Sequence, residues 1–543
     1  MNRMNHSQPR PDMSLAKSRF RNFCIRNEVA GLWIVSLAVF MLGIWRQPFI
    51  NFETRFAVFA QEMLRHGPSL FPTTYGQPYP DYPVTSTLFI WLISLPFGEV
   101  TKFAAVLPTA VASAIVIAMT YKLFADYSKK WALFAVAFEF LTVTFLAESR
   151  SISVDQMLSV VTVSAFYLTH RSYRDNSALP TWQLMLLLVA GFLIRGPIGV
   201  VIPAGVVLSH LLLTSDRKAV LSFALYSGGV LVICVATLVG LAAIVHGVDF
   251  VKEVARMQAL GRFAESTPSP KYYYFVSSLG NYALSYPLAV MAALALLVAR
   301  WTKTDRFGSG QQVRLAYLLV AWIAIILVGL SVPETKKVRY ILPAVPAFAG
   351  LAAYLFVASD RPVMKWIRRG VALMLFSLPF LAAIFPVVEK KRLSGYGIDI
   401  TVSTSVFVVL AFASTAIVVW RKRRKLESLG TVMAVAVLTV VYLQIAIVEP
   451  IDLRIHDTSR FVREVEAMRA QQPGTLAFYQ ENPDGAPIKY LVNVDADLLP
   501  LFIDEPSNLD SIRYPIWLLT REKNIDDLKR AGVDTESATY RGR

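Results

Sequence analysis

The charged side chains that could do chemistry lie in a few short stretches between long apolar runs. The first stretch, INFETRFAVFAQEMLRHG, follows the first apolar run and carries Glu53, Arg55 and Glu62. A carboxylate there can orient an acceptor hydroxyl or take its proton, and a guanidinium can hold a phosphate. Apolar residues recur at helical spacing, so we expect an interfacial helix over 53–66 with Glu53 and Arg55 facing its polar side. An interfacial helix whose charges are merely solvated explains the same pattern.

Three later stretches carry further charges at the ends of apolar runs. Asp155 in AESRSISVD opens a run, where a carboxylate also favours a helix N-terminus. Arg195 in FLIRGPIGVVIP lies between two runs beside a Gly-Pro turn, where snorkelling is the simpler interpretation. Lys336, Lys337 and Arg339 in ETKKVRYILPAVP form a cationic cluster that is harder to explain without an anionic ligand.

These residues must be positioned by a membrane-embedded scaffold. The chain has 543 residues, of which 55% are apolar and only 17% charged, with a mean hydropathy of +0.49. Soluble proteins carry about a quarter charged residues, so this composition indicates a polytopic, all-α membrane protein. The polar, basic start shows no cleavable signal peptide. Cys24 and Cys234 are too isolated to suggest a disulfide framework or a metal site.

About thirteen runs are long enough to cross a bilayer as helices. We expect spans near 29–47, 103–125, 131–147, 155–170, 182–195, 196–214, 219–246, 276–299, 314–332, 340–358, 371–388, 402–420 and 429–449.

Basic connections such as DYSKK, SDRKA and RKRRK alternate with the chemistry-bearing loops, so the positive-inside rule places the latter on the outer side. This placement explains the net charge of +16 without nucleic acid as a partner. We expect a cytoplasmic basic tail over 1–28 and a transmembrane domain over 29–449. Its first outer loop, 48–102, carries interfacial helices, one of them over Leu88–Phe97. The strand and turn signals after 450 predict a small α/β domain over 450–543 on the outer side.

Transporters place ionisable residues at mid-membrane, whereas the charges here gather in outer loops. This favours chemistry at the membrane surface. The ordered set FETR, YGQPYPDYPVTSTLFIW, SVDQM, IRGPIGVVIP and KKVRYILP resembles the motifs of GT-C fold membrane glycosyltransferases. The greatest likeness is to the 4-amino-4-deoxy-L-arabinose transferases of lipid A, with protein O-mannosyltransferases as more distant relatives. GRFAESTPSPKYYY is also similar to a long outer loop of that family.

The resemblance implies a multi-pass protein of the bacterial inner membrane, with its active site and C-terminus on the periplasmic side. It would move a sugar from a polyprenyl-phosphate donor to lipid A, lipopolysaccharide or another envelope glycan. The carboxylates that would act as base or orient the acceptor are Glu53, Asp81 and Asp155. The cations that would hold the donor phosphate are Arg55, Arg262, Lys336, Lys337 and Arg339. The residues that would line the substrate groove are Tyr82, Arg195 and Tyr340.

The chain departs from the family pattern in its first loop. Phe52 stands where the family has an aspartate, and Tyr82 stands where it has a lysine. The base is therefore open among Glu53, Asp81 and Asp155, or the acceptor is already ionised and needs none. No zinc site is expected at Asp81, which has no histidine nearby; no cofactor is certain, and a divalent metal stays possible. The alternatives are a protein O-glycosyltransferase, a transporter of lipid-linked sugars and a non-catalytic lipid-binding relative.

Overall fold

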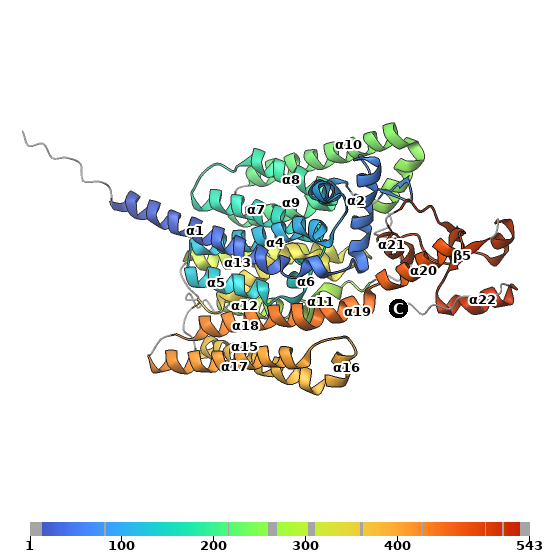
Figure 1. The fold of residues 1–543 in the computed structure, drawn as a ribbon. Coiled ribbons are helices and arrows are strands. Elements are labelled where there is room, and N and C mark those ends of the chain that lie inside the picture. Colours follow the sequence, from blue (N-terminus) through green and yellow to red (C-terminus); the bar gives the residue numbers. More distant parts are fainter. Residues whose placement is uncertain are drawn as a thin grey trace, which may run out of the picture.

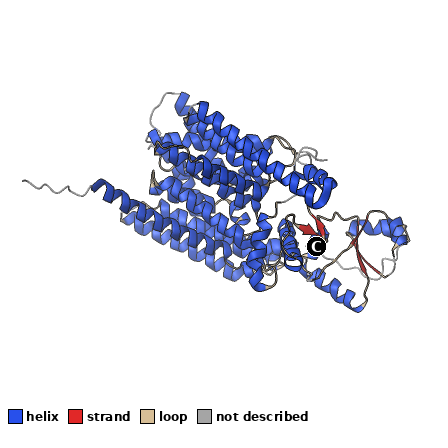
Figure 2. Ribbon diagram, turned by 90° about the horizontal axis from the view of Figure 1, so that it is seen from above, coloured by secondary structure: helices blue, strands red, loops and turns tan. Residues whose placement is uncertain are grey.

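The computed structural model describes residues 13–80, 83–215, 217–258, 269–301, 310–358, 362–424, 427–494, 496–512 and 515–532. It is a bundle of helices that run mostly along one direction, with a small α/β segment at one end (Figure 1). Seen from above, the strands are confined to that end (Figure 2). We call it the domain end of the bundle.

The elements that build the bundle are α1 (Met13–Met41), α4 (Lys102–Ala125), α5 (Lys129–Phe140), α6 (Val143–Glu148), α7 (Val154–Arg174), α8 (Thr181–Arg195), α9 (Ile198–Thr214), α10 (Arg217–Gln258, kinked at Gly247), α11 (Tyr273–Asn281), α12 (Ser285–Trp301), α13 (Gly310–Ser331), the 3-10 helix η5 (Val338–Ala344), α14 (Val345–Tyr354), α15 (Pro362–Val388), α16 (Lys390–Ser394), α17 (Ile400–Arg423), α18 (Leu429–Leu443), the π-helical turn η6 (Gln444–Val448) and α19 (Glu449–His456). The first loop holds η1 (Ile44–Arg46), η2 (Asn51–Glu53), α2 (Thr54–His66), a two-stranded β1–β2 hairpin (Thr73–Thr74 and Gln77–Pro78), α3 (Thr85–Ser94) and η3 (Leu95–Phe97).

Each predicted span coincides with a helix or with two consecutive shorter helices. The spans 131–147, 276–299 and 340–358 are the broken ones, formed by α5 and α6, by α11 and α12, and by η5 and α14. Within the described residues, seven helical segments are long and apolar enough to cross a membrane, and five shorter apolar helices accompany them. The chain is therefore an all-α polytopic membrane protein, and the total of thirteen crossings stays a prediction.

The bundle core is built on close contacts between α4, α5 and α14. The Trp131 indole donates a hydrogen bond of 2.7 Å to the Gly350 carbonyl oxygen and stacks on Phe124 at 4.9 Å between ring centroids. Tyr354 packs on the same indole. An indole N–H buried in an apolar interior needs such an acceptor, so this contact fixes how α5 lies against α14.

The α/β segment begins with α20 (Ser459–Gln471), in which the predicted helix RFVREVEAM lies, followed by β3 (Thr475–Tyr479), α21 (Ala486–Leu491), β4 (Leu501–Ile503), η7 (Pro506–Ser511), β5 (Ile516–Leu519), η8 (Glu522–Asn524) and α22 (Ile525–Arg530). Its three strands form a parallel sheet in the order β4-β3-β5. Both predicted strands, TLAFYQE and YPIWLLT, contain a strand of this sheet. Leu476 and Phe478 pack with α20 on one face, and Ala477 and Tyr479 pack with α22 on the other, as the alternation of side chains along a strand requires.

Candidate active site

The first loop buries Glu53 instead of exposing it. Only 5% of Glu53 is accessible, and its carboxylate forms an ion pair with Lys102, the equally buried first residue of α4. The backbone amides of Ile50 and Ile152 approach the same carboxylate at 3.0 and 3.4 Å. The prediction that Glu53 faces the polar side of the helix was therefore wrong. The positive charge of Lys102, at the start of α4, compensates the buried carboxylate of Glu53. The helix α2, which follows Glu53, packs inward through Phe56 and its other apolar residues.

Asp155, Arg195 and Arg339 meet in one buried ion cluster. Arg195 Nε donates to Asp155 Oδ1 at 3.1 Å, and Arg339 Nε lies 3.2 Å from Asp155 Oδ2. Only 4% of the Asp155 side chain is accessible. Two guanidiniums thus share one carboxylate in the protein interior, where charge is poorly screened.

A tight helical hairpin positions Arg195. The residue ends α8, and Gly196 adopts φ 64° before α9 begins, a left-handed conformation that favours glycine. Gly191 and Gly199 bring the two helices into direct contact, because a Cβ on Gly191 would lie 2.1 Å from the Gly199 carbonyl oxygen. Small residues at a helix crossing permit this approach. The sequence IRGPIG therefore aims Arg195 back at the start of α7.

The short helix η5 supplies the other cation of the cluster. Arg339 comes from η5, and the Tyr340 ring packs under both guanidiniums, with centroid distances of 5.4 Å to Arg195 and 5.9 Å to Arg339. Lys336 does not share in the cluster; its Nζ donates to the main-chain carbonyls of Ser269 and Pro333 at 3.0 and 2.6 Å. Lys337 is exposed. The structure therefore brings Arg195, Arg339 and Tyr340 together and gives Lys336 a loop-fastening contact.

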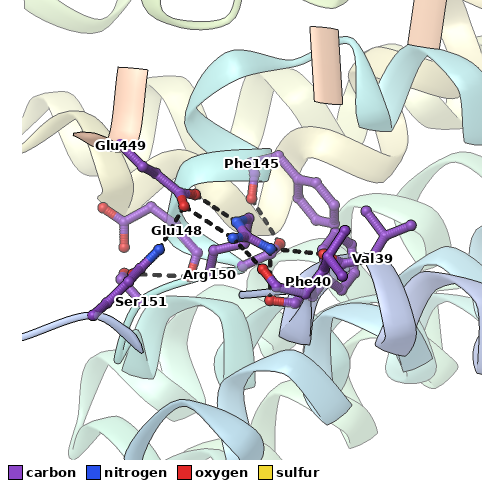
Figure 3. A network of polar contacts seen from close by, with 10 residues as sticks. Val39, Phe40, Phe145, Glu148, Arg150, Ser151 and Glu449 are labelled. Atoms are coloured by element: carbon purple, nitrogen blue, oxygen red, sulfur yellow. Dashed lines mark hydrogen bonds and ion pairs between the residues drawn. The ribbon is translucent and has the colours of Figure 1, made fainter. Parts of the chain in front are cut away.

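A second buried arginine ties three elements together beside this cluster. Arg150 donates to the α1 carbonyl oxygens of Val39 and Phe40 at 2.7 and 3.1 Å, and to the Leu42 carbonyl oxygen at 2.8 Å. Its Nε and Nη2 also pair with Glu449 at the start of α19 (Figure 3). All five donor hydrogens of the guanidinium are thus used. They satisfy the orphan carbonyls at the end of α1 and fix α19 against it.

A cavity of about 230 Å³ opens between these groups. Its lining residues are Gln47, Ile50, Asn51, Glu53, Lys102, Ala147, Glu148, Arg150, Ser151, Ile152, Arg339, Gln444, Glu449, Asp452 and Leu453. Glu53 and Arg339, two of the predicted site residues, thus face the same space, and Asp155 lies directly behind Arg339. The roles predicted for these side chains stay predictions.

Arg55 lies elsewhere, at the contact between the first loop and the α/β segment. Its Nη2 lies 3.5 Å from Asp484 Oδ1 and donates to the Asp484 carbonyl oxygen at 3.3 Å. Tyr79 donates to the other Asp484 oxygen at 3.0 Å and lies under the guanidinium. A second cavity of about 290 Å³ is lined by Arg55, Asp484 and Lys489, among others. In this structure Arg55 holds the α/β segment in place.

Three predicted site residues, Asp81, Tyr82 and Arg262, lie outside the described residues. Within the residues that the structure does describe, no group of three or more His, Cys, Asp or Glu side chains is arranged to hold a metal ion. Metal dependence therefore stays untested.

Sequence reasoning missed Lys102, Glu148, Arg150 and Glu449 as members of the site. A signal for two of them was present, because Glu148 and Arg150 lie in AESRSISVD, an outer loop whose basic residue runs against the positive-inside rule. Lys102 and Glu449 begin helices at opposite ends of the chain, and no local pattern connects them with this loop.

Comparison with known proteins gives consistent matches. The family model described as dolichyl-phosphate-mannose-protein mannosyltransferase matches residues 81–240. Undecaprenyl phosphate-alpha-4-amino-4-deoxy-L-arabinose arabinosyl transferases of Serratia proteamaculans and Sodalis glossinidius are 25% and 26% identical over 342 and 357 residues. These alignments cover 60% and 61% of this chain, and they span 59% and 60% of the relatives' own lengths.

The structural comparison extends over nearly the whole chain. The crystal structure of ArnT from Cupriavidus metallidurans bound to undecaprenyl phosphate superimposes with a TM-score of 0.68, at 16% identity, over 93% of this chain and 95% of that one. This chain has the GT-C fold of membrane glycosyltransferases. The GT-C fold, the apolar helices and the relatives together indicate a multi-pass protein of the bacterial inner membrane.

Proposed function

We propose that this chain transfers a sugar from a polyprenyl-phosphate carrier to an acceptor on the periplasmic face of the inner membrane. The observation that carries the proposal is the Arg339 guanidinium, which lines the cavity and is held there by Asp155, whose other oxygen is bound by Arg195. The other cations that line the cavity are already neutralised, Lys102 by Glu53 and Arg150 by Glu449. Arg339 is the lining cation that we expect to bind the donor phosphate.

The chemistry of transfer fits this charge distribution. When the glycosidic bond breaks, negative charge grows on the oxygen of the departing phosphate. A fixed guanidinium at a low-dielectric boundary stabilises that charge without reorganisation, and an arginine can donate two hydrogen bonds to one phosphate. Asp155, whose other oxygen is bound by Arg195, holds Arg339 in place, while Tyr340 packs against it. Similarity to transferases named for undecaprenyl phosphate-linked donors supports the same donor class here.

The acceptor is proposed as lipid A, lipopolysaccharide or another envelope glycan. A protein acceptor is the second candidate, because the family model that matches residues 81–240 is described by protein mannosylation. Mass spectrometry of surface lipids and glycans, with and without the protein, distinguishes the two when glycopeptides of the same strains are analysed in parallel.

The test of the site is an Arg339→Ala variant expressed in a deletion strain. We expect the sugar modification that the wild-type chain restores to be lost, and binding of undecaprenyl phosphate to the purified protein to weaken at least tenfold. Arg171→Ala is the matched control, because Arg171 is an exposed arginine near the opposite end of α7 from Asp155. Full modification by Arg339→Ala, at wild-type protein levels, would remove the support for this site.

A further inference from the structure

The cavity is lined by four acidic side chains, and three of them are occupied by contacts. Glu53 pairs with Lys102, and Glu449 pairs with Arg150 and accepts from Gln47 at 2.7 Å. Asp452 Oδ1 lies 2.7 Å from His456 Nδ1 in the same helix. Each of these three carboxylates thus has a protein side chain as its partner.

The fourth acidic residue, Glu148, interacts with the Ser153 hydroxyl and lies in the field of Arg339. It is the last residue of α6 and lines the cavity, and within the described part of the chain its carboxylate forms no ion pair. Figure 3 shows it beside the Arg150–Glu449 network but outside the ion pairs of that network. Glu148 is thus the cavity carboxylate that remains available to a bound molecule.

The surroundings of Glu148 favour the uptake of a proton. Burial raises the pKa of the Glu148 carboxyl above its usual range; Arg339 and a hydrogen bond from Ser153 oppose this shift, and the nearby charges of Asp155 and Glu53 add to it. A carboxylate with a raised pKa is a stronger base than an exposed glutamate, and its pKa lies closer to the working pH.

We propose that Glu148 is the general base that activates the acceptor. This inference rests on the proposed function. The acceptor hydroxyl gives its proton to a Glu148 carboxylate oxygen, and the acceptor oxygen forms a bond to the anomeric carbon of the donor sugar. The bond between that carbon and the carrier phosphate oxygen breaks, and its electron pair leaves with the phosphate beside Arg339. Glu148 then releases the proton to water.

The same cavity explains why Glu53 does not take this role. Lys102 and the Ile50 amide both contact Glu53 Oε1, and the Ile152 amide approaches Oε2. Both oxygens are therefore engaged by fixed donors. Because Phe52 brings no carboxylate to the preceding position, the base comes from the α6–α7 loop instead of the first loop.

The test uses membrane vesicles from a deletion strain that expresses the full chain, so that the membranes supply their own donor and acceptor lipids. Glu148→Gln is expected to lower the rate of sugar incorporation by about 100-fold or more, the usual contribution of a general base. Its melting temperature and its binding of added undecaprenyl phosphate are expected to stay at wild-type values. Glu464→Gln, at an exposed position in α20, is the matched control.

Two readouts separate catalysis from a structural role. The wild-type rate should rise with pH through the pKa of Glu148, while the residual rate of Glu148→Gln should lose this dependence. Formate added to vesicles with Glu148→Ala should restore part of the rate, since it supplies a carboxylate to the vacated space. Wild-type incorporation by Glu148→Gln, or no rescue of Glu148→Ala, overturns the assignment. No incorporation by the wild-type chain instead overturns the proposed function.

Discussion

Arg339 Nε lies 3.2 Å from Asp155 Oδ2, although the two residues are 184 positions apart in the chain. Arg195 holds the other oxygen of the same carboxylate at 3.1 Å. The ion cluster thus connects three segments of the chain: the start of α7, the turn between α8 and α9, and η5, which precedes α14.

Removal of the shared carboxylate should release both arginines. In Asp155→Asn, two buried guanidiniums lose their counter-charge, and we expect a loss of about 3–5 kcal/mol in stability together with loss of sugar transfer. Thermal unfolding in detergent and mass spectrometry of the envelope measure the two effects. The control Asp175→Asn removes an exposed carboxylate at the end of α7 and should change neither.

The Glu53–Lys102 pair should behave as a buried ion pair. Lys102→Met leaves Glu53 buried without its cation, so we expect destabilisation by about 3–5 kcal/mol. The double variant Glu53→Leu, Lys102→Met should recover most of that loss, because no uncompensated charge remains. A melting temperature of the double variant below those of Glu53→Leu alone and Lys102→Met alone would contradict this account.

The Arg55–Asp484 contact should govern docking of the α/β segment. Arg55→Ala is expected to increase cleavage of the segment in limited proteolysis while the bundle stays intact. A double-mutant cycle with Asp484→Ala should give a coupling of about 1 kcal/mol, since the Asp484 side chain is 30% exposed. The same double-mutant cycle on the exposed pair Arg460–Glu464 is the control, and we expect its coupling energy to be smaller than that of Arg55 and Asp484. Equal couplings for the two pairs would argue against a docking role.

The contact between Gly191 and Gly199 should control the position of Arg195. Gly191→Ala forces α8 and α9 apart, because the added Cβ meets the Gly199 carbonyl oxygen. We expect lower thermal stability and a fall in transfer of tenfold or more, although the substituted residue is outside the cavity lining. Gly228→Ala in α10, where a Cβ meets no atom within 4 Å, should be tolerated. Unchanged transfer by Gly191→Ala would mean that Arg195 does not need this hairpin geometry.

Much of the fold followed from local patterns. The apolar runs predicted the positions of the bundle helices, including α4, α8 and α9, and the alternation in TLAFYQE predicted β3. The resemblance also assigned Asp155 and Arg339 to one active site, and the structure places the two side chains in contact. The burial of Glu53 was not predictable in this way, since it depends on Lys102, whose charge looked like one more basic residue of an outer loop. The contact between Arg55 and Asp484 was not predictable either, because Asp484 lies in a distant segment of the chain.

The sequence by itself determined that this chain lies in a membrane, where its helices run and which loops hold its charges. These properties depend on the transfer of about twenty consecutive residues into lipid, a local free energy. Only the tertiary structure decided which charges pair with one another. That outcome depends on distances between residues far apart in the chain, and those distances pair Lys102 with Glu53, Arg150 with Glu449, and Arg339 with Asp155.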